Sequence, residues 1–169
     1  MEIISDPQQV AVLAKAKEQS IPVFFKFLKQ NFKSKEIDSA VHELNENISS
    51  AIDCTKCGNC CKNMNAAMDE SEMKKLASCL SKTSQEFSKN YCSHDEIENV
   101  FFIKSLPCVF LADNKCTVYK QRPESCAEFP HLNKPNFIFR TKATSDNYNY
   151  CPIVYNVVEN LKKHYQFKG

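Results

Sequence analysis

The most informative segment for chemistry is a run of four cysteines within eight residues, Cys54-Thr-Lys-Cys57-Gly-Asn-Cys60-Cys61. A Cys-x-x-Cys step turns two sulfurs toward one point, so a third cysteine at the same interval can offer three thiolates to a single ion or cluster. Because adjacent residues rarely reach one centre together, we expect Cys61 to point elsewhere, toward a second centre or a bridging position. The spacing predicts a metal site, with zinc and iron–sulfur both open.

Four cysteines further along the chain would complete two sets of four ligands. Cys108 and Cys116 flank a predicted hairpin turn, and Cys126 lies one turn into a predicted short helix. Cys151 precedes the last helix, whose positive dipole end favours a thiolate. We therefore predict eight metal ligands, which are Cys54, Cys57, Cys60, Cys61, Cys108, Cys116, Cys126 and Cys151. Cys79 and Cys92 lie in helical patterns and are interpreted as core or adventitious thiols.

The charge balance argues against two classes of partner. With 22 basic and 20 acidic residues in 169, the net charge is +2, which encodes no long-range attraction to nucleic acid or to a membrane surface. No run approaches the roughly 20 apolar residues of a membrane span. The expected partners are metal ions, and a protein substrate if the chain is an enzyme.

The expected compartment decides how the ten cysteines are interpreted. The start MEIISDPQQV has neither the basic nor the apolar region of a signal peptide, so we predict a cytoplasmic protein. Thiols stay reduced there, which favours metal thiolates over a disulfide scaffold, the alternative reading of an even cysteine count. Gly58 is the only interior glycine and is expected to let the cysteine loop turn tightly and aim its amide groups at sulfur.

Helical signals dominate the two ends of the chain. Asp6-Pro7 is typical of a helix start, and apolar spacing indicates one kinked helix or two short ones over about 7–32. A second helix is predicted from Ser34 to Ile52, leading directly into Cys54. Further helices are predicted after Asp69, where Asp69-Glu-Ser-Glu72 is typical of a capping box, and after Ser84, Pro123 and Cys151.

Short strands are predicted in the middle of the chain. Val100–Ile103 and Asn136–Arg140 have strand composition, and residues 108–119 read as a β-hairpin around an Asp-Asn turn. We therefore predict a helix-dominated α+β fold, with a small antiparallel hairpin or sheet and helices around a cysteine-rich metal site. The expected organisation is one domain over 1–169. Its parts are N-terminal helices over 1–52, a metal-chelating core over 53–155 and a C-terminal helix over 152–167.

Several motifs together resemble a known family. They are Cys54-x-x-Cys57-x-x-Cys60-Cys61, Pro107-Cys108-Val-Phe-Leu111 and Cys116-Thr-Val-Tyr119-x-x-Arg122-Pro123-x-x-Cys126-x-x-Phe129-Pro130. This ordered set resembles the YkgJ-type CxxCxxCC cysteine-cluster family, a zinc- or iron-chelating domain in a group that includes the flagellin lysine N-methylases. The resemblance covers about residues 50–155 and implies metal chelation by these cysteines.

Arg122 and Tyr119 belong to the recognised motif and are the candidate cofactor-binding residues. The Arg122 guanidinium either binds an anionic group, such as a substrate carboxylate beside the metal, or pairs with an acidic side chain and loop carbonyls. Tyr119 is expected to be a packed strand residue rather than a catalytic acid.

Three functional hypotheses follow, and the sequence leaves open whether the chain is an enzyme. The first is a cytosolic metal-binding protein with a redox or metal-dependent role, with iron–sulfur favoured over zinc because three cysteines share one loop and a fourth is distant. The second is a methylase similar to the flagellin lysine N-methylases, in which an open iron holds S-adenosylmethionine. The third is a structural zinc module for protein interaction. A Rossmann-type methyltransferase is excluded because no glycine-rich loop is present.

Overall fold

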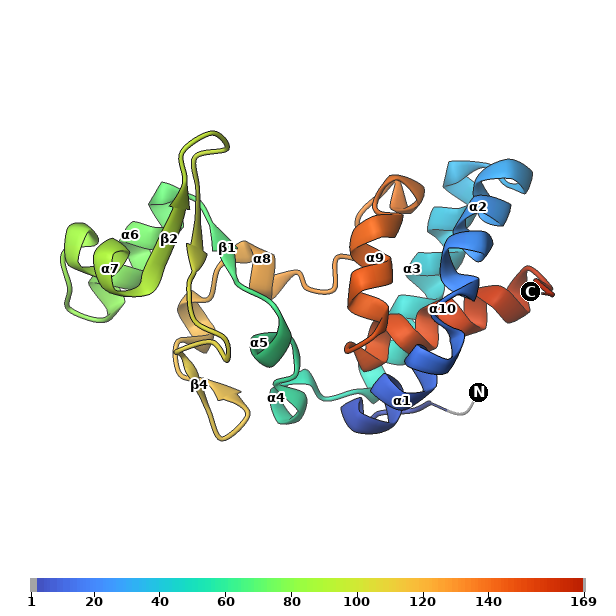
Figure 1. Cartoon of the computed structure of the whole chain (residues 1–169), viewed down its shortest axis with the longest axis horizontal. Helices are drawn as coiled ribbons and strands as arrows, with labels where there is room; N and C mark the ends of the chain where they lie inside the picture. The colour runs from blue at the N-terminus through green and yellow to red at the C-terminus, as the bar shows by residue number, and fades with distance from the viewer. Residues whose placement is uncertain (1–2, 169) are drawn as a thin grey trace. The chain divides into compact units, whose positions relative to one another are not determined.

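The computed structural model describes residues 3–168 and has the predicted helix-dominated α+β composition. Its residues form two compact units, which Figure 1 shows coloured along the chain. We call Cys54–Phe129 the cysteine unit, and we call the unit formed within Met1–Asp53 and Pro130–Gly169 the helical unit. None of the helices within residues 3–168 combines the length and the apolar composition of a membrane span. The single domain expected from the sequence stays a prediction.

The cysteine unit combines short helices with two small antiparallel sheets. Its helices are α4 (Cys54–Cys57), α5 (Cys60–Asn63), α6 (Glu70–Cys79), α7 (Ser84–Tyr91) and α8 (Glu124–Ala127), with the 3-10 turn η1 (Tyr119–Gln121). The first sheet has the order β1-β3-β2, from β1 (Ala67–Met68), β2 (Cys92–Asp95) and β3 (Val100–Ile103). The second sheet is the hairpin of β4 (Leu111–Ala112) and β5 (Lys115–Cys116). The strand predicted at Val100–Ile103 is confirmed, and β1 and β2, which were not predicted, pair on either side of it.

Two capping boxes begin the longer helices of this unit. The Asp69 carboxylate accepts a hydrogen bond from the Glu72 amide at 2.8 Å, and the Glu72 carboxylate accepts one from the Asp69 amide at 3.0 Å. Thr83 and Glu86 form the same reciprocal pair at α7, so the cap is Thr83 rather than the predicted Ser84. Each box satisfies amide groups that a helix start leaves without an internal partner.

The apolar core of the cysteine unit lies between α6, α7 and the first sheet. Its buried side chains are Ala66, Met68, Met73, Leu76, Ala77, Phe87, Phe101, Ile103, Phe110 and Val118. Phe87 of α7 stacks almost parallel to Phe110 with ring centroids 6.2 Å apart. The core therefore includes the residue that directly precedes β4. Four partly buried cysteines pack against this core, namely Cys92, Cys108, Cys116 and Cys126. Three of the predicted ligands therefore lie at the margin of an apolar cluster.

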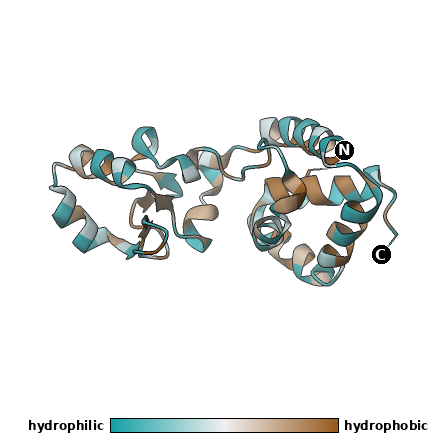
Figure 2. Ribbon diagram, turned by 90° about the horizontal axis from the view of Figure 1, so that it is seen from above, coloured by the Kyte–Doolittle hydropathy of each residue, from teal (hydrophilic) through white to brown (hydrophobic). Residues whose placement is uncertain are grey.

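The helical unit is held by packing around its last helix. Its elements are α1 (Pro7–Lys17), α2 (Ser20–Asn31), α3 (Ser34–Ala51), the 3-10 turn η2 (Phe137–Phe139), α9 (Thr141–Tyr148) and α10 (Pro152–His164). Helix α10 packs against α1, α3 and α9. It buries Ile153, Val157 and Leu161, and Figure 2 shows brown, apolar residues along the helices of this unit.

The N-terminal helices begin and end at polar signals. Asp6 caps α1, as predicted, by accepting hydrogen bonds from the amides of Gln8 and Gln9 at 3.1 and 3.4 Å. The segment predicted as one kinked helix or two short ones resolves into two. The break falls just before Ser20, whose hydroxyl donates to the Lys17 carbonyl at 2.7 Å.

One predicted strand is wrong. The segment Asn136–Arg140 contains η2 (Phe137–Phe139) instead of a strand, and Asn136 takes the left-handed backbone conformation with φ of 60°. The carboxylate of Asp38 in α3 accepts hydrogen bonds from the Asn136 and Phe137 amides at 2.7 and 2.8 Å. These bonds hold a turn against α3, and local composition cannot reveal them because Asp38 is distant in the sequence.

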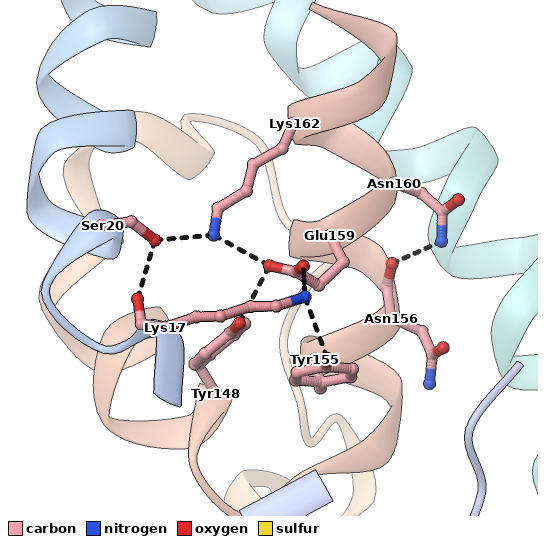
Figure 3. A network of polar contacts seen from close by, with 8 residues as sticks. All are labelled: Lys17, Ser20, Tyr148, Tyr155, Asn156, Glu159, Asn160 and Lys162. Atoms are coloured by element: carbon pink, nitrogen blue, oxygen red, sulfur yellow. Dashed lines mark hydrogen bonds and ion pairs between the residues drawn. The ribbon is translucent and has the colours of Figure 1, made fainter. Parts of the chain in front are cut away.

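A polar network joins α1, α2, α9 and α10 of the helical unit (Figure 3). The Glu159 carboxylate accepts hydrogen bonds from the Tyr148 hydroxyl at 2.9 Å, from Lys162 Nζ at 2.8 Å and from Lys17 Nζ at 2.5 Å. Lys162 also donates to the Ser20 hydroxyl at 3.0 Å. The Glu159 side chain is only 15% exposed, so its charge depends on these donors in place of water.

The same network sets the charge state of its members. Burial alone would raise the pKa of Glu159, but hydrogen bonds from Lys162, Lys17 and Tyr148 outweigh burial and lower that pKa. Burial would lower the pKa of Lys17, but its hydrogen bond to Glu159 and the Glu159 charge raise it. The carboxylate and the ammonium groups therefore stabilise one another's ionised forms.

We predict that Glu159→Ala lowers the free energy of unfolding by about 2–4 kcal/mol, because two ammonium groups and a phenol lose a shared buried partner. The matched control is Glu18→Ala, which breaks an exposed ion pair with Lys15 at 3.1 Å and should cost under about 1 kcal/mol. Urea unfolding followed by far-ultraviolet circular dichroism measures both values. Equal costs for the two variants would contradict the prediction.

The destabilisation by Glu159→Ala should also depend on pH. Because the Glu159 pKa is lowered in the folded protein, its stabilising effect is complete above the ordinary Glu pKa of about 4.3. That effect is lost as the pH falls through the lowered pKa. The difference in unfolding free energy between the native protein and Glu159→Ala should therefore be constant near neutrality and narrow below about pH 4. A gap that widens on acidification would contradict this.

Candidate metal centre

The predicted cysteine loop consists of two single helical turns joined at Gly58. Helix α4 ends with a hydrogen bond from the Gly58 amide to the Cys54 carbonyl at 3.3 Å, and α5 begins at Cys60. Gly58 has φ of 60°, a conformation that side chains with a Cβ disfavour. A Cβ added to Gly58 would lie 2.9 Å from the Asn114 carbonyl oxygen, so the loop and the hairpin turn are in close backbone contact. The tight turn expected at Gly58 is confirmed.

The hairpin supplies the second side of the site. Asp113 and Asn114 form its two-residue turn with φ of 50° and 62°, as in a type I′ turn, and Leu111 pairs with Cys116. The Cys108 amide donates to the Cys61 carbonyl at 2.7 Å, which joins the residues before the hairpin to the cysteine loop. The predicted hairpin is thus confirmed, with shorter strands than expected.

Four thiols from four places in the chain interact electrostatically, and we call Cys61, Cys108, Cys116 and Cys126 the thiol group. Burial raises the pKa of Cys108 and of Cys116, and the negative charge of Cys61 raises each further. Burial raises the pKa of Cys126 to about 11, with added contributions from Cys61, Cys108 and Cys116. Charge on any member therefore disfavours charge on the others, which requires the four sulfurs to be near one another.

The neighbouring thiols of Cys60 and Cys61 contact each other. Their Sγ atoms are 3.9 Å apart, and the second centre or bridging position expected for Cys61 stays a prediction. Their hydrogen bond is the main reason that the pKa of Cys61 falls to about 7, against an opposing effect of burial. Cys61 is thus the member of the thiol group that ionises most readily, and a thiolate is the form that binds metals.

The remaining predicted ligands are placed differently. Cys54 is exposed and Cys57 half-buried at the two ends of α4, which packs against β5. Cys151 is buried in the helical unit at the N-cap of α10, and its assignment as a ligand stays a prediction. Cys79 is exposed at the end of α6, so it is not a core residue, and Cys92 begins β2 rather than lying in a helix.

The cysteines have the donor atoms that zinc and iron prefer, but they are not arranged as in a metal-bound site. Zinc and iron both bind thiolates at about 2.3 Å, which gives about 3.8 Å between two sulfurs of a tetrahedral site. The 3.9 Å between the sulfurs of Cys60 and Cys61 matches that spacing. Within residues 3–168, however, no group of three His, Cys, Asp or Glu side chains has an arrangement that would hold a metal ion. The donor chemistry fits zinc or iron, and the thiol group lies close together without coordination geometry.

Arg122 lies beside the thiol group and stacks on Tyr119. The guanidinium carbon is 3.7 Å from the centre of the Tyr119 ring, and the Arg122 charge lowers the pKa of Cys116 against the larger effect of burial. Tyr119 is half-exposed and lies in η1, so the packed strand position expected for it is wrong. Sequence reasoning missed Asn114 as the contact of Gly58. The sequence held one indication of this contact, because the only interior glycine and the Asp-Asn turn are both residues that favour left-handed backbone.

The comparisons with known proteins identify a family. The family model described as "CxxCxxCC: Putative zinc- or iron-chelating domain" matches residues 53–152, which is 100 of the 169 residues of the chain. The match includes all eight cysteines predicted as ligands. No curated protein and no solved structure matches the chain.

We predict that Gly58→Ala destabilises the cysteine unit by about 1–3 kcal/mol, because alanine is strained at positive φ and its Cβ meets the Asn114 backbone. Asn114→Gly is the control, since glycine also suits the left-handed turn position and should be neutral or slightly stabilising. Thermal unfolding measures both effects. A neutral Gly58→Ala would show that the loop and the hairpin turn are not in contact.

Proposed function

This chain belongs to the CxxCxxCC family of zinc- or iron-chelating domains, and on that premise we propose that it binds its metal through the thiolates of the cysteine unit. The favoured form is an iron–sulfur protein with a redox or metal-dependent role. The thiol group, with Cys60 beside Cys61, would form the first centre. Cys54, Cys57 and Cys60 would offer three thiolates on the loop side.

The observation that carries the proposal is the convergence of Cys61, Cys108, Cys116 and Cys126. The Cys108 amide donates to the Cys61 carbonyl at 2.7 Å, and Cys108, Cys116 and Cys126 pack at the margin of one core, close enough for their charges to affect one another's pKa. These residues come from α5, from the segment before the hairpin, from β5 and from α8. Cys108, Cys116 and Cys126 also pack against the apolar core, so it is their position beside Cys61 in a chain that matches a metal-chelating family that supports a metal site. A cation at their centre would turn the repulsion between thiolates into attraction, because each sulfur would then face a positive charge.

Iron–sulfur is favoured by the number of thiolates that the loop offers. Three cysteines at Cys-x-x-Cys-x-x-Cys spacing are typical of clusters, whereas zinc generally takes two separated knuckles. A closed zinc site is the second candidate, because the half-buried thiol group alone supplies four sulfurs, and a structural zinc needs no more. The methylase alternative requires an iron with an open position for S-adenosylmethionine and a protein substrate.

The composition of the metal centre is the first test. We predict that protein purified without oxygen contains iron and acid-labile sulfide, is brown, and bleaches when dithionite reduces it. A spectral change on adding S-adenosylmethionine would favour an open iron and the methylase alternative. Stoichiometric zinc in colourless protein, without sulfide even after anaerobic expression with added iron, would overturn the iron–sulfur proposal and support the structural zinc module.

Single cysteine variants test which residues hold the centre. We predict that Cys116→Ser and Cys126→Ser lose most of the bound metal and much of the stability, because a structural metal contributes on the order of 10 kcal/mol to folding. Cys79→Ser is the matched control and should keep its metal, since Cys79 is exposed at the end of α6. Metal content per protein and the unfolding midpoint are the measurements. Equal metal content in all three variants would refute the assignment of the thiol group.

Cys151→Ser asks separately whether the thiol in the helical unit is a ligand. Because Cys151 is buried at the start of α10, a small loss of stability is expected from packing alone. Loss of metal together with stability would assign it as a ligand. Retained metal would restrict the centre to the cysteine unit.

A further inference from the structure

A cavity of about 300 Å³ lies within the cysteine unit, outside the thiol group. It is lined by Glu72 and Lys75 of α6 and by Lys120, Gln121 and Arg122 at η1. Its volume is at the lower end of the range for pockets that hold small molecules. The lining contains three cationic side chains and one carboxylate, so the pocket favours an anion.

The carboxylate in this pocket is already occupied by backbone donors. Glu72 Oε2 accepts from the Asp69 amide at 3.0 Å, and Glu72 Oε1 accepts from the Glu124 amide at 2.7 Å. The side chain thereby ties the start of α6 to the start of α8. Because both oxygens accept from backbone amides, Glu72 is held in the wall of the pocket and forms no ion pair with its cations.

The cations of the pocket are left without such partners. Lys75 and Lys120 form no ion pair with any acidic side chain in the part of the chain that is described, residues 3–168. Arg122 donates no hydrogen bond to any of these residues either, and its Nε is buried without a partner. The positive charges of these three side chains are therefore available to an anion in the pocket.

The Arg122 guanidinium is nevertheless held in one orientation. Its stacking on Tyr119, 3.7 Å from the ring centre, fixes the plane of the five N–H donors. A planar fork of donors with a fixed orientation suits two oxygens of one carboxylate or phosphate group. Lys75 and Lys120 then add two positive charges to the same cavity.

We propose that this pocket binds a small oxyanion with two negative charges, a phosphate or a dicarboxylate, with Arg122 as its anchor. The three cations and the carboxylate of the lining give a net charge of +2, which such an anion neutralises. The proposal concerns a second ligand and does not rest on the identity of the metal. Arg122 is also close enough to Cys116 for its charge to lower the pKa of that thiol, so the anion would lie near the thiol group.

The test is a titration of the purified full-length protein with inorganic phosphate and, separately, with succinate, followed by isothermal calorimetry at low ionic strength. We expect one of the two to bind with a dissociation constant of about 1 mM or lower. The anion that binds shows whether the pocket is specific for a phosphate or for a dicarboxylate. Arg122→Lys should weaken that binding at least about tenfold, because lysine cannot offer the paired donors. Lys75→Gln and Lys120→Gln should each weaken it about three- to tenfold.

The control is Lys89→Gln, which removes an exposed positive charge from the same unit outside the pocket lining and should leave binding unchanged. If Arg122→Lys fails to fold because stacking on Tyr119 is lost, the two lysine variants carry the test, since neither stacks on that ring. No binding of either anion up to about 10 mM, unchanged binding in all three pocket variants, or an equal loss in Lys89→Gln would each overturn the proposal. Every one of these results would leave the metal proposal untouched, because the titration does not require a loaded centre.

Discussion

The gathering of ionisable thiols is the interaction on which the cysteine unit depends. Thiolates repel one another, and burial penalises each charge further, so the pKa values of Cys108, Cys116 and Cys126 are raised, whereas the hydrogen bond with Cys60 lowers the pKa of Cys61. Two backbone features hold the group together against that repulsion. One is the hydrogen bond from the Cys108 amide to the Cys61 carbonyl, and the other is the close contact between Gly58 and the hairpin turn. A bound cation would remove the electrostatic cost of the arrangement.

Positive charge from the chain itself enters the same region through Arg122. Its guanidinium lies flat on Tyr119, lowers the pKa of Cys116 and lines a cationic pocket. One side chain thus connects the thiol group to a cavity that can admit a ligand. In a metal-binding protein, that connection gives an anion a way to influence the centre through charge, without coordinating the metal.

Local signals in the sequence were sufficient for much of the fold. The Asp6 cap, the Asp69–Glu72 capping box and the Asp113-Asn114 turn are formed by residues within a few positions of one another, and all are confirmed. Predictions were wrong or absent where a distant residue decides the local structure. Asp38 converts an expected strand into η2, and the pairing of β1 and β2 with β3 has no local signature. The cysteine positions indicated a metal site, but only tertiary contacts select the four thiols that influence one another.

The two units are stabilised in different ways. The helical unit buries apolar faces of α3 and α10 and holds a nearly buried carboxylate with three donors, so ordinary packing and hydrogen bonding account for its fold. The cysteine unit has a smaller core, and Cys108, Cys116 and Cys126 form part of its margin. Small cores supply little net stability, and a metal bound at the margin would fix the side chains that close it. The candidate ligands are therefore also packing residues, which couples the state of the thiol group to the order of the apolar core beneath it.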